Sequence, residues 1–391
     1  MDFDTIIDRT NAHSAKWDKL PDLYGLEAEG TLSMWVADMD FRSPDCVIEA
    51  GRKLTEHGVF GYRGDYDGYN DAIAWWMKTR HNWDVKSDEI FTTYGLINGM
   101  NMALWAFTQP GDEVIIFTPV YHVFSIAIKE AGRAVRECPL AVGEDGRHHM
   151  DFDAYEANMT GKEKAIVLCS PHNPGGRVWT ADELRALCEL AARHNLLIIS
   201  DEIHHDLVFP GEKHVPLVNA APEHLDRIIM MAAPSKTFNV AGNHAGMVII
   251  QDPAMKKVFS DLMIGLHIAP TIYGTAMTEA AYTPAGAEWL DALMDYLAEN
   301  ARIFGEGMNA LPGVTAMPMQ STYLAWIDFR DTGMTPDEVK KRVVDQAKIA
   351  PSYGPTFGTG GEGHLRFNLG MPRVQIEEAV SRLHGAFADL Q

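Results

Sequence analysis

The chain has 391 residues, 46% of them hydrophobic, which is enough to bury a substantial core and to build two domains. Its 54 acidic and 33 basic residues give a formal net charge of −21, so we expect no general affinity for nucleic acid or for anionic membrane surfaces. The first residues show no basic and apolar leader pattern, and no apolar run approaches the ~18 residues of a membrane span, so neither export nor insertion is indicated.

Between about residues 90 and 250, short apolar runs alternate with amphipathic segments, a pattern typical of α/β proteins. Five runs are expected to form strands, at residues 113–118, 164–169, 196–200, 228–232 and 246–250. Most are continuously apolar, so we expect a mainly parallel sheet that helices cover on both faces. Between the second and third runs, Thr180 and Glu183 form a capping-box pattern that opens a helix.

The pattern changes after about residue 280. An amphipathic segment at 286–311 is followed by a strand-like run at 322–329, a second capping-box pattern at 335–338, another run at 364–370 and a final helix. The N-terminal segment has no obvious place in the sheet pattern. We therefore expect a three-layer αβα large domain at residues 45–280 and a smaller α+β domain formed by residues 1–44 and 281–391.

Polar side chains follow three successive predicted strands. Asn173 lies in "SPHNPGG", Asp201 begins "DEIHHD", and Lys236 ends "APSK". Because ligands collect beyond the carboxyl ends of strands in such sheets, we expect these three side chains to meet at one edge. A lysine for a Schiff base with an aldehyde, an acid for a pyridine nitrogen and a donor for a phenolate oxygen are what pyridoxal 5'-phosphate requires.

These motifs, 28 residues apart from Asn173 to Asp201 and 35 from Asp201 to Lys236, resemble the core of the fold-type-I pyridoxal-phosphate enzymes, the aspartate-aminotransferase superfamily. The likeness covers essentially the whole chain. The stretches "MWVADMDF", "GYRGDYDGY" and "DEIHHDL" resemble the bacterial C–S lyase branch, the cystathionine β-lyases with class I/II aminotransferase architecture. The resemblance implies an aspartate-aminotransferase-like fold.

The resemblance also implies roles at matching positions. Lys236 would hold the cofactor covalently and act as general base, and Asp201 would pair with the pyridine nitrogen. Tyr121 would stack on the ring, while Asn173 and His204 would contact its 3'-oxygen. The implied phosphate ligands are the backbone amides of Gly95, Leu96 and Ile97, the hydroxyl of Ser235 and, from the neighbouring subunit of a homodimer, Tyr62.

Arg366, in "GHLRFNLGMPR", matches the superfamily's arginine for the substrate α-carboxylate, a pairing that suits a guanidinium fork. Two positions depart from the aminotransferase pattern. His244 stands where an arginine would pair with the phosphate, and Ala233 stands where a serine is usual. The phosphate site is therefore expected to differ from that of the aminotransferases.

The branch resemblance implies a C–S β-lyase that converts a sulfur amino acid to a thiol, pyruvate and ammonia; cystathionine would give homocysteine. An aminotransferase shares the chemistry up to loss of the Cα proton, so this alternative stays open. A third hypothesis, from another class, is a regulatory protein that mainly binds a partner. Lys236, Asp201, Asn173 and Arg366 together favour an enzyme with a small-molecule amino-acid substrate over this hypothesis.

The histidine-rich stretches "HHD" at 204–206 and "RHH" at 147–149 could suggest a metal site. Neither has HExxH or Cys/His ligand spacing, so no metal is predicted, and His205 is interpreted as a mere neighbour of His204. The four cysteines are widely spaced and form no CxxC pair, which predicts reduced thiols and a cytoplasmic setting.

Overall fold

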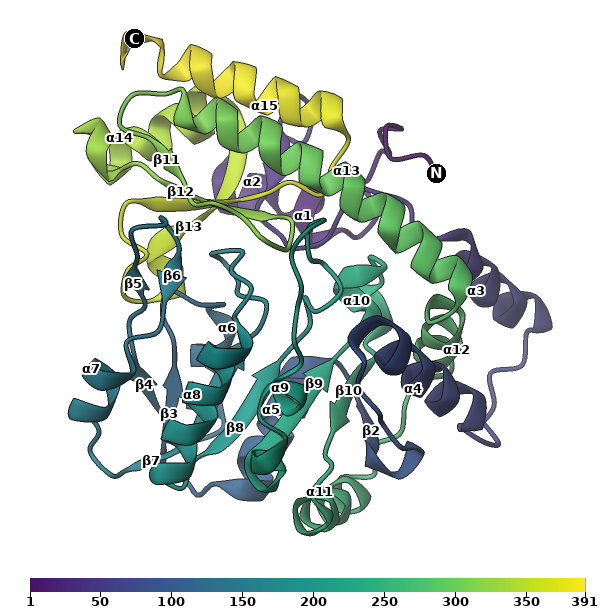
Figure 1. The fold of residues 1–391 in the computed structure, drawn as a ribbon. Coiled ribbons are helices and arrows are strands. Elements are labelled where there is room, and N and C mark those ends of the chain that lie inside the picture. Colours follow the sequence, from purple (N-terminus) through teal and green to yellow (C-terminus); the bar gives the residue numbers. More distant parts are fainter. Residues whose placement is uncertain (391) are drawn as a thin grey trace.

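In the computed structural model, which describes residues 1–390, the strands form two main sheets (Figure 1). The larger has seven strands in the order β2 (Ile90–Thr93), β10 (Gly246–Ile249), β9 (Ile228–Ala232), β8 (Leu197–Asp201), β7 (Glu163–Cys169), β3 (Glu113–Ile116) and β4 (Ala134–Glu137). The pairs from β9 to β4 are parallel, whereas β10 is antiparallel to both neighbours. The predicted α/β class and mainly parallel sheet are confirmed.

The large sheet is buried on both faces, as its apolar runs predict. Along β7, Ala165 and Val167 pack into one hydrophobic cluster, with α5 (Leu96–Phe107), α6 (Val123–Glu130) and α11 (Pro253–Leu266). Ile166 and Leu168 face the other way, into the cluster that includes α4 (Asp67–His81) and α8 (Ala181–Arg193). Successive side chains of a strand point to opposite faces, so continuous apolar runs are needed here.

All five predicted strands are present, with ends within two residues of the expected ones. The edge strands β2 and β4 were not predicted. β4 reads Ala-Val-Arg-Glu and none of its residues is fully buried, so it carries no apolar run. The capping box of α8 is confirmed: Thr180 Oγ1 accepts from the Glu183 amide at 3.2 Å, and Glu183 Oε2 accepts from the Thr180 amide at 2.7 Å.

The second sheet has five strands in the order β1 (Leu32–Met34), β13 (Ile349–Tyr353), β14 (His364–Asn368), β12 (Leu324–Asp328) and β11 (Thr315–Ala316). The N-terminal segment thus enters this sheet at its edge, where β1 pairs with β13 in parallel. Helices α13 (Pro284–Asn309) and α15 (Arg373–Ala386) lie side by side over the sheet (Figure 1). A helical turn at α14 (Pro336–Lys340), capped by Thr335, continues into a π-helix at Lys341–Gln346.

The remaining elements are short or connect the two sheets: α1 (Ala15–Asp18), α2 (Leu20–Tyr24), α3 (Asp45–His57), the β5 (Ala141–Val142) and β6 (His148–His149) hairpin, α7 (Phe152–Ala157), α9 (Leu217–Ala220), α10 (Pro234–Thr237) and α12 (Ile272–Ala281). Helix α13 packs Leu290 and Leu293 into the core of the large sheet, and Phe304 and Met308 into the core of the small sheet. We propose the division into residues 45–280 and residues 1–44 with 281–391 because each part contains one of the two main sheets.

Candidate active site

A cavity of about 290 Å³ lies at the carboxyl ends of β7, β8 and β9. Of the residues predicted to hold a cofactor, it is lined by Gly95, Leu96, Ile97, Tyr121, Asn173, Asp201, His204, Ser235 and Lys236. The three strands are consecutive parallel neighbours, with Cys169 opposite Asp201 and Asp201 opposite Met231. Parallel pairing therefore brings together side chains that are far apart in the sequence.

Lys236 lies on the short helix α10, directly after β9. Its side chain is half-buried, and the amine donates a hydrogen bond to the carbonyl of Ala37 at 2.5 Å. Burial lowers the pKa of Lys236 to about 8, against a partly opposing effect of the Asp38 and Asp201 charges. The lysine can thus give up its proton close to neutral pH, which suits a nucleophile or a general base.

Asp201 is the last residue of β8 and is buried at the cavity wall. Its Oδ1 accepts one hydrogen bond, from the amide of Ile203 at 3.1 Å. Burial raises the pKa of Asp201 to about 7, because the carboxylate loses water and gains little compensation. A cationic or N–H-bearing ring brought into the cavity would stabilise this carboxylate.

Asn173 and His204 flank the same cavity. Asn173 Oδ1 accepts from the Arg366 guanidinium at 3.0 Å. His204 is buried, and within residues 1–390 its Nδ1 has no hydrogen-bond partner. Burial, together with the nearby Lys236 charge, lowers the pKa of His204 to about 3, so its ring is neutral.

Arg366 sits on β14 and reaches the cavity wall through Asn173. Its guanidinium also donates to the Trp35 carbonyl at 2.7 Å and to Ser352 Oγ at 3.1 Å. No carboxylate pairs with it among the described residues, and its Nε has no partner there. Burial lowers the pKa of Arg366 to about 10, the mark of a buried cation that lacks a matching anion.

The helix α5 begins at the cavity with Gly95 as its N-cap. Gly95 has φ +90°, a conformation that favours glycine, and no side chain caps the amides of the first turn. Gly246 allows this approach, because a Cβ there would come within 2.8 Å of the Gly95 backbone. Free amides and the helix dipole make this end of the cavity suited to an anion.

His244 lines the cavity together with Ser235, whereas Ala233 is buried outside the lining. His244 thus lines the same cavity as Gly95, Leu96 and Ile97 at the start of α5. Tyr121 is held in an edge-to-face contact with Phe124, with 5.6 Å between ring centroids.

Tyr62 is the one predicted residue that lies away from this cavity. It is fully exposed between α3 and α4 and lines a separate pocket with Tyr66 and Tyr69.

The segment 34–41, "MWVADMDF", places backbone carbonyls beside the active-site cavity. The side chains of this segment gave no sign of that role in the sequence. The Ala37 carbonyl accepts from Lys236 and, at 3.0 Å, from the hydroxyl of Tyr323. Asn368 Nδ2 holds the segment by donating to the carbonyls of Val36 at 2.5 Å and Asp38 at 2.6 Å. The motif was visible in the sequence, but its contact with Lys236 was not.

Comparison with known proteins gives a consistent result. The family model for aminotransferase class I and II matches residues 32–383. The cystathionine beta-lyase PatB of Bacillus subtilis (strain 168) is 36% identical over 392 residues, covering 99% of this chain and 100% of PatB. Among solved structures, cystalysin from Treponema denticola, which contains a pyridoxal 5'-phosphate cofactor, matches with TM-score 0.94 and 36% identity, covering 100% of this chain and 99% of cystalysin. The pyridoxal-phosphate-bound C-S lyase from Staphylococcus hominis matches with TM-score 0.90 and 27% identity, covering 99% and 98% of the two chains.

Proposed function

The chain belongs to the aminotransferase class I and II family, and on that premise we propose that the protein is a pyridoxal-phosphate-dependent C–S β-lyase. Its substrate class is L-amino acids with sulfur on Cβ, such as cystathionine. The products are a thiol, pyruvate and ammonia. The full-length similarity to a cystathionine beta-lyase and to a C-S lyase structure supports the lyase outcome over transamination.

The residues present fit the cofactor. His204 Nδ1 and Arg366 Nε are buried polar atoms without partners in the described chain, and the Asp201 carboxyl has a raised pKa. We assign the phosphate to the amides of the α5 N-terminus with Ser235 and His244, the pyridine nitrogen to Asp201, and the ring to Tyr121. Asn173 and His204 are assigned to the 3'-oxygen, and Lys236 to the covalent attachment.

Bound pyridoxal phosphate supplies an aldehyde that takes the substrate amine and a ring that accepts electrons from Cα. Arg366 binds the substrate carboxylate, which fixes the Cα–H bond relative to Lys236. The Lys236 amine, with its lowered pKa, removes the Cα proton. Asp201 holds the proton on the pyridine nitrogen, and the sulfur then leaves Cβ with the bonding electron pair.

The single observation that carries this proposal is the convergence of Lys236, Asp201 and Asn173 on one cavity at the ends of three adjacent strands. The test is incubation with L-cystathionine and no 2-oxo acid. We expect continuous release of pyruvate and free thiol over many turnovers. Turnover that needs an added 2-oxo acid would instead identify an aminotransferase.

A matched pair of lysine variants completes the test. Lys236→Ala is expected to abolish pyruvate release, whereas Lys257→Ala, at an exposed position on α11, is expected to retain it. A purified protein that stays colourless after addition of pyridoxal phosphate would contradict both enzyme functions and favour the partner-binding hypothesis.

We also propose a homodimer with shared active sites. An exposed apolar surface between α3 and α4 and at the end of α11 supports it, formed by Val59, Phe60, Tyr62, Ile264 and Leu266. No helix within residues 1–390 is long and apolar enough to cross a membrane. All four cysteines are free, three of them buried, which supports a reducing, cytoplasmic location.

A further inference from the structure

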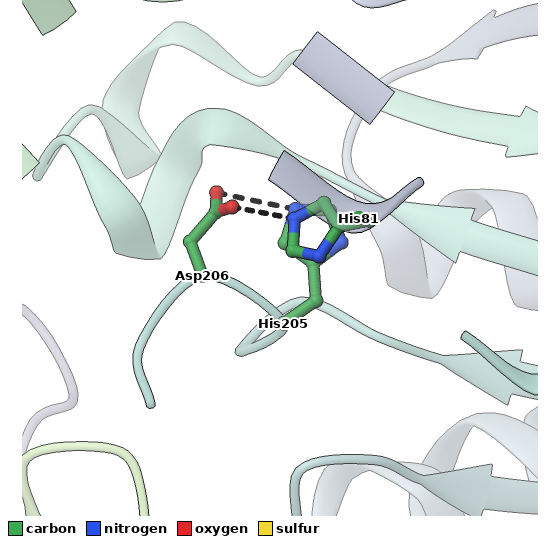
Figure 2. A group of neighbouring side chains, drawn as sticks. All are labelled: His81, His205 and Asp206. Atoms are coloured by element: carbon green, nitrogen blue, oxygen red, sulfur yellow. Dashed lines mark hydrogen bonds and ion pairs between the residues drawn. The ribbon is translucent and has the colours of Figure 1, made fainter. Parts of the chain in front are cut away.

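Two histidines and an aspartate form a buried cluster (Figure 2). His81 is the last residue of α4, while His205 and Asp206 follow β8. The His81 Nε2 lies 2.7 Å from Asp206 Oδ1, and the His205 Nε2 lies 3.2 Å from Asp206 Oδ2. Figure 2 shows both rings turned toward the same carboxylate, and their centroids are 4.3 Å apart.

The three ligand atoms are within 4.8 Å of one another, close enough to surround one ion. One polar atom of the cluster has no hydrogen-bond partner within the described chain. The His205 Nε2 makes no hydrogen bond, although it lies only 3.2 Å from Asp206 Oδ2. The His205 side chain is only 2% exposed, so this nitrogen is a buried polar atom aimed at the carboxylate without a hydrogen bond. A metal ion bound through Nε2 would satisfy it.

The cluster opens into a pocket of about 240 Å³ that His214 also lines. Glu202 accepts a hydrogen bond from the His214 ring at Nε2, over 2.8 Å, and within residues 1–390 the His214 Nδ1 has no partner. Glu202 thus holds His214 in the tautomer with the proton on Nε2, which leaves Nδ1 with a free lone pair. A water molecule from the pocket can complete the coordination.

Asp206 is held in place by groups that would remain bonded to it in a metal complex. Trp76 Nε1 donates to Oδ1 at 3.0 Å, and Thr237 Oγ1 donates to Oδ2 at 2.8 Å. Ligating carboxylates in metal sites are typically fixed by such outer hydrogen bonds. The Thr237 contact also places the cluster one residue from Lys236.

We propose that His81, His205 and Asp206 bind a divalent transition-metal ion, with Zn²⁺ as the preferred occupant. Two imidazoles and one carboxylate are a donor set for Zn²⁺ and its neighbours, whereas Mg²⁺ and Ca²⁺ prefer oxygen ligands alone. On binding, the His81 proton shifts from Nε2 to Nδ1, and both Nε2 lone pairs point to the cation. The site lies outside the cavity assigned to pyridoxal phosphate and is independent of the proposed reaction.

The test uses the full-length protein with its pyridoxal phosphate bound, treated with a chelator that is then removed, and titrated with Co²⁺. We expect one Co²⁺ per chain, seen as visible d–d absorption bands, and displacement of Co²⁺ by Zn²⁺ but not by Mg²⁺. Absence of d–d bands at millimolar Co²⁺ would overturn the proposal and leave His81 and His205 as ion-pair neighbours of Asp206 without a metal.

Variants distinguish this site from adventitious binding. His205→Gln and His81→Gln should each weaken Co²⁺ binding at least about tenfold, since loss of even an outer partner costs about that much. His194→Gln is the matched control, because His194 also pairs with a carboxylate, Glu156 Oε1 at 2.7 Å, but at the surface. Circular dichroism confirms that each variant is folded. Equal Co²⁺ affinity in wild type and both cluster variants would contradict the proposal.

Discussion

At the scale of single residues, burial shifts the pKa values of Asp201 and Lys236 in opposite directions. The Asp201 pKa rises to about 7 and the Lys236 pKa falls to about 8, in each case because the charged form loses water. Both groups therefore change protonation near neutral pH. These residues can exchange protons at working pH only because the fold has removed them from solvent.

The raised pKa of Asp201 predicts a pH-dependent stability of the cofactor-free protein. The carboxyl ionises at 3.8 when unfolded and at about 7 when folded, so the folded state binds the proton more tightly. Its stabilising effect is complete below about pH 4 and is lost as the pH rises to about 7. Relative to Asp201→Asn, wild type should lose up to about 4 kcal/mol of unfolding free energy across this window.

Urea unfolding of the two cofactor-free proteins at about pH 5 and about pH 8 covers the upper part of this window, where wild type should lose about 2.5 kcal/mol relative to Asp201→Asn. Parallel pH profiles for wild type and Asp201→Asn would show that Asp201 does not titrate as described.

Arg366 is predicted to recognise the substrate carboxylate through its two-pronged geometry. Arg366→Lys keeps the charge but loses the fork, so kcat/KM for cystathionine should fall by roughly 10- to 100-fold, equivalent to about 1.5–3 kcal/mol. Arg382→Lys, at a site paired with Glu378 on α15, should leave steady-state kinetics unchanged. Equal kinetics for Arg366→Lys and wild type would remove the assigned role.

At the scale of elements, the N-cap of helix α8 depends on one side chain and can be tested by a single substitution. Thr180→Ala removes the hydroxyl that accepts from the Glu183 amide at the start of α8. The unfolding free energy should fall by about 1 kcal/mol, while Thr180→Ser should stay close to wild type. Denaturant unfolding of the three proteins measures both effects. A loss in the serine variant equal to that in alanine would show that the methyl group, not the cap, matters.

Elements with strong local signals were predictable from the sequence. The apolar strands β7, β8 and β9 and the capped helix α8 were found because burial on two faces and capping each leave a pattern in neighbouring residues. Strand β1 was not, because three residues carry no period and its partner β13 lies more than 300 residues away. Sequence patterns do not encode such long-range pairing.

Local patterns also made parts of the active site predictable, whereas long-range contacts in it and in the His81–His205–Asp206 cluster were not. Lys236, Asp201 and Asn173 were found because each follows a strand of one parallel sheet, which fixes where strand ends meet. The Ala37 carbonyl bonded to Lys236 was missed because a backbone group has no sequence signal. His81 was missed as a partner of His205 because metal motifs are sought at short spacing, and these residues are 124 positions apart.

At the scale of the whole molecule, the proposed homodimer would share each active site between two chains. Tyr62 lies outside its own cavity, on an exposed apolar surface. If it acts across the interface, mixing inactive Lys236→Ala with impaired Tyr62→Ala restores one complete site in each mixed dimer. Activity should recover to about a quarter of wild type after subunit exchange, given random pairing of a symmetric dimer.

Pyruvate release by the mixture, against each variant alone, measures this recovery. A mixture no more active than the mean of its two components would show that Tyr62 acts within its own chain or not at all.

The central claim is that pyridoxal phosphate is attached to Lys236 in the cavity at the ends of β7, β8 and β9. Borohydride reduction of the yellow protein, followed by peptide mass spectrometry, tests it most directly. We expect a phosphopyridoxyl label on the peptide that contains Lys236, and none on this peptide in Lys236→Ala. A label on a different lysine, or no label in a protein that releases pyruvate, would contradict it.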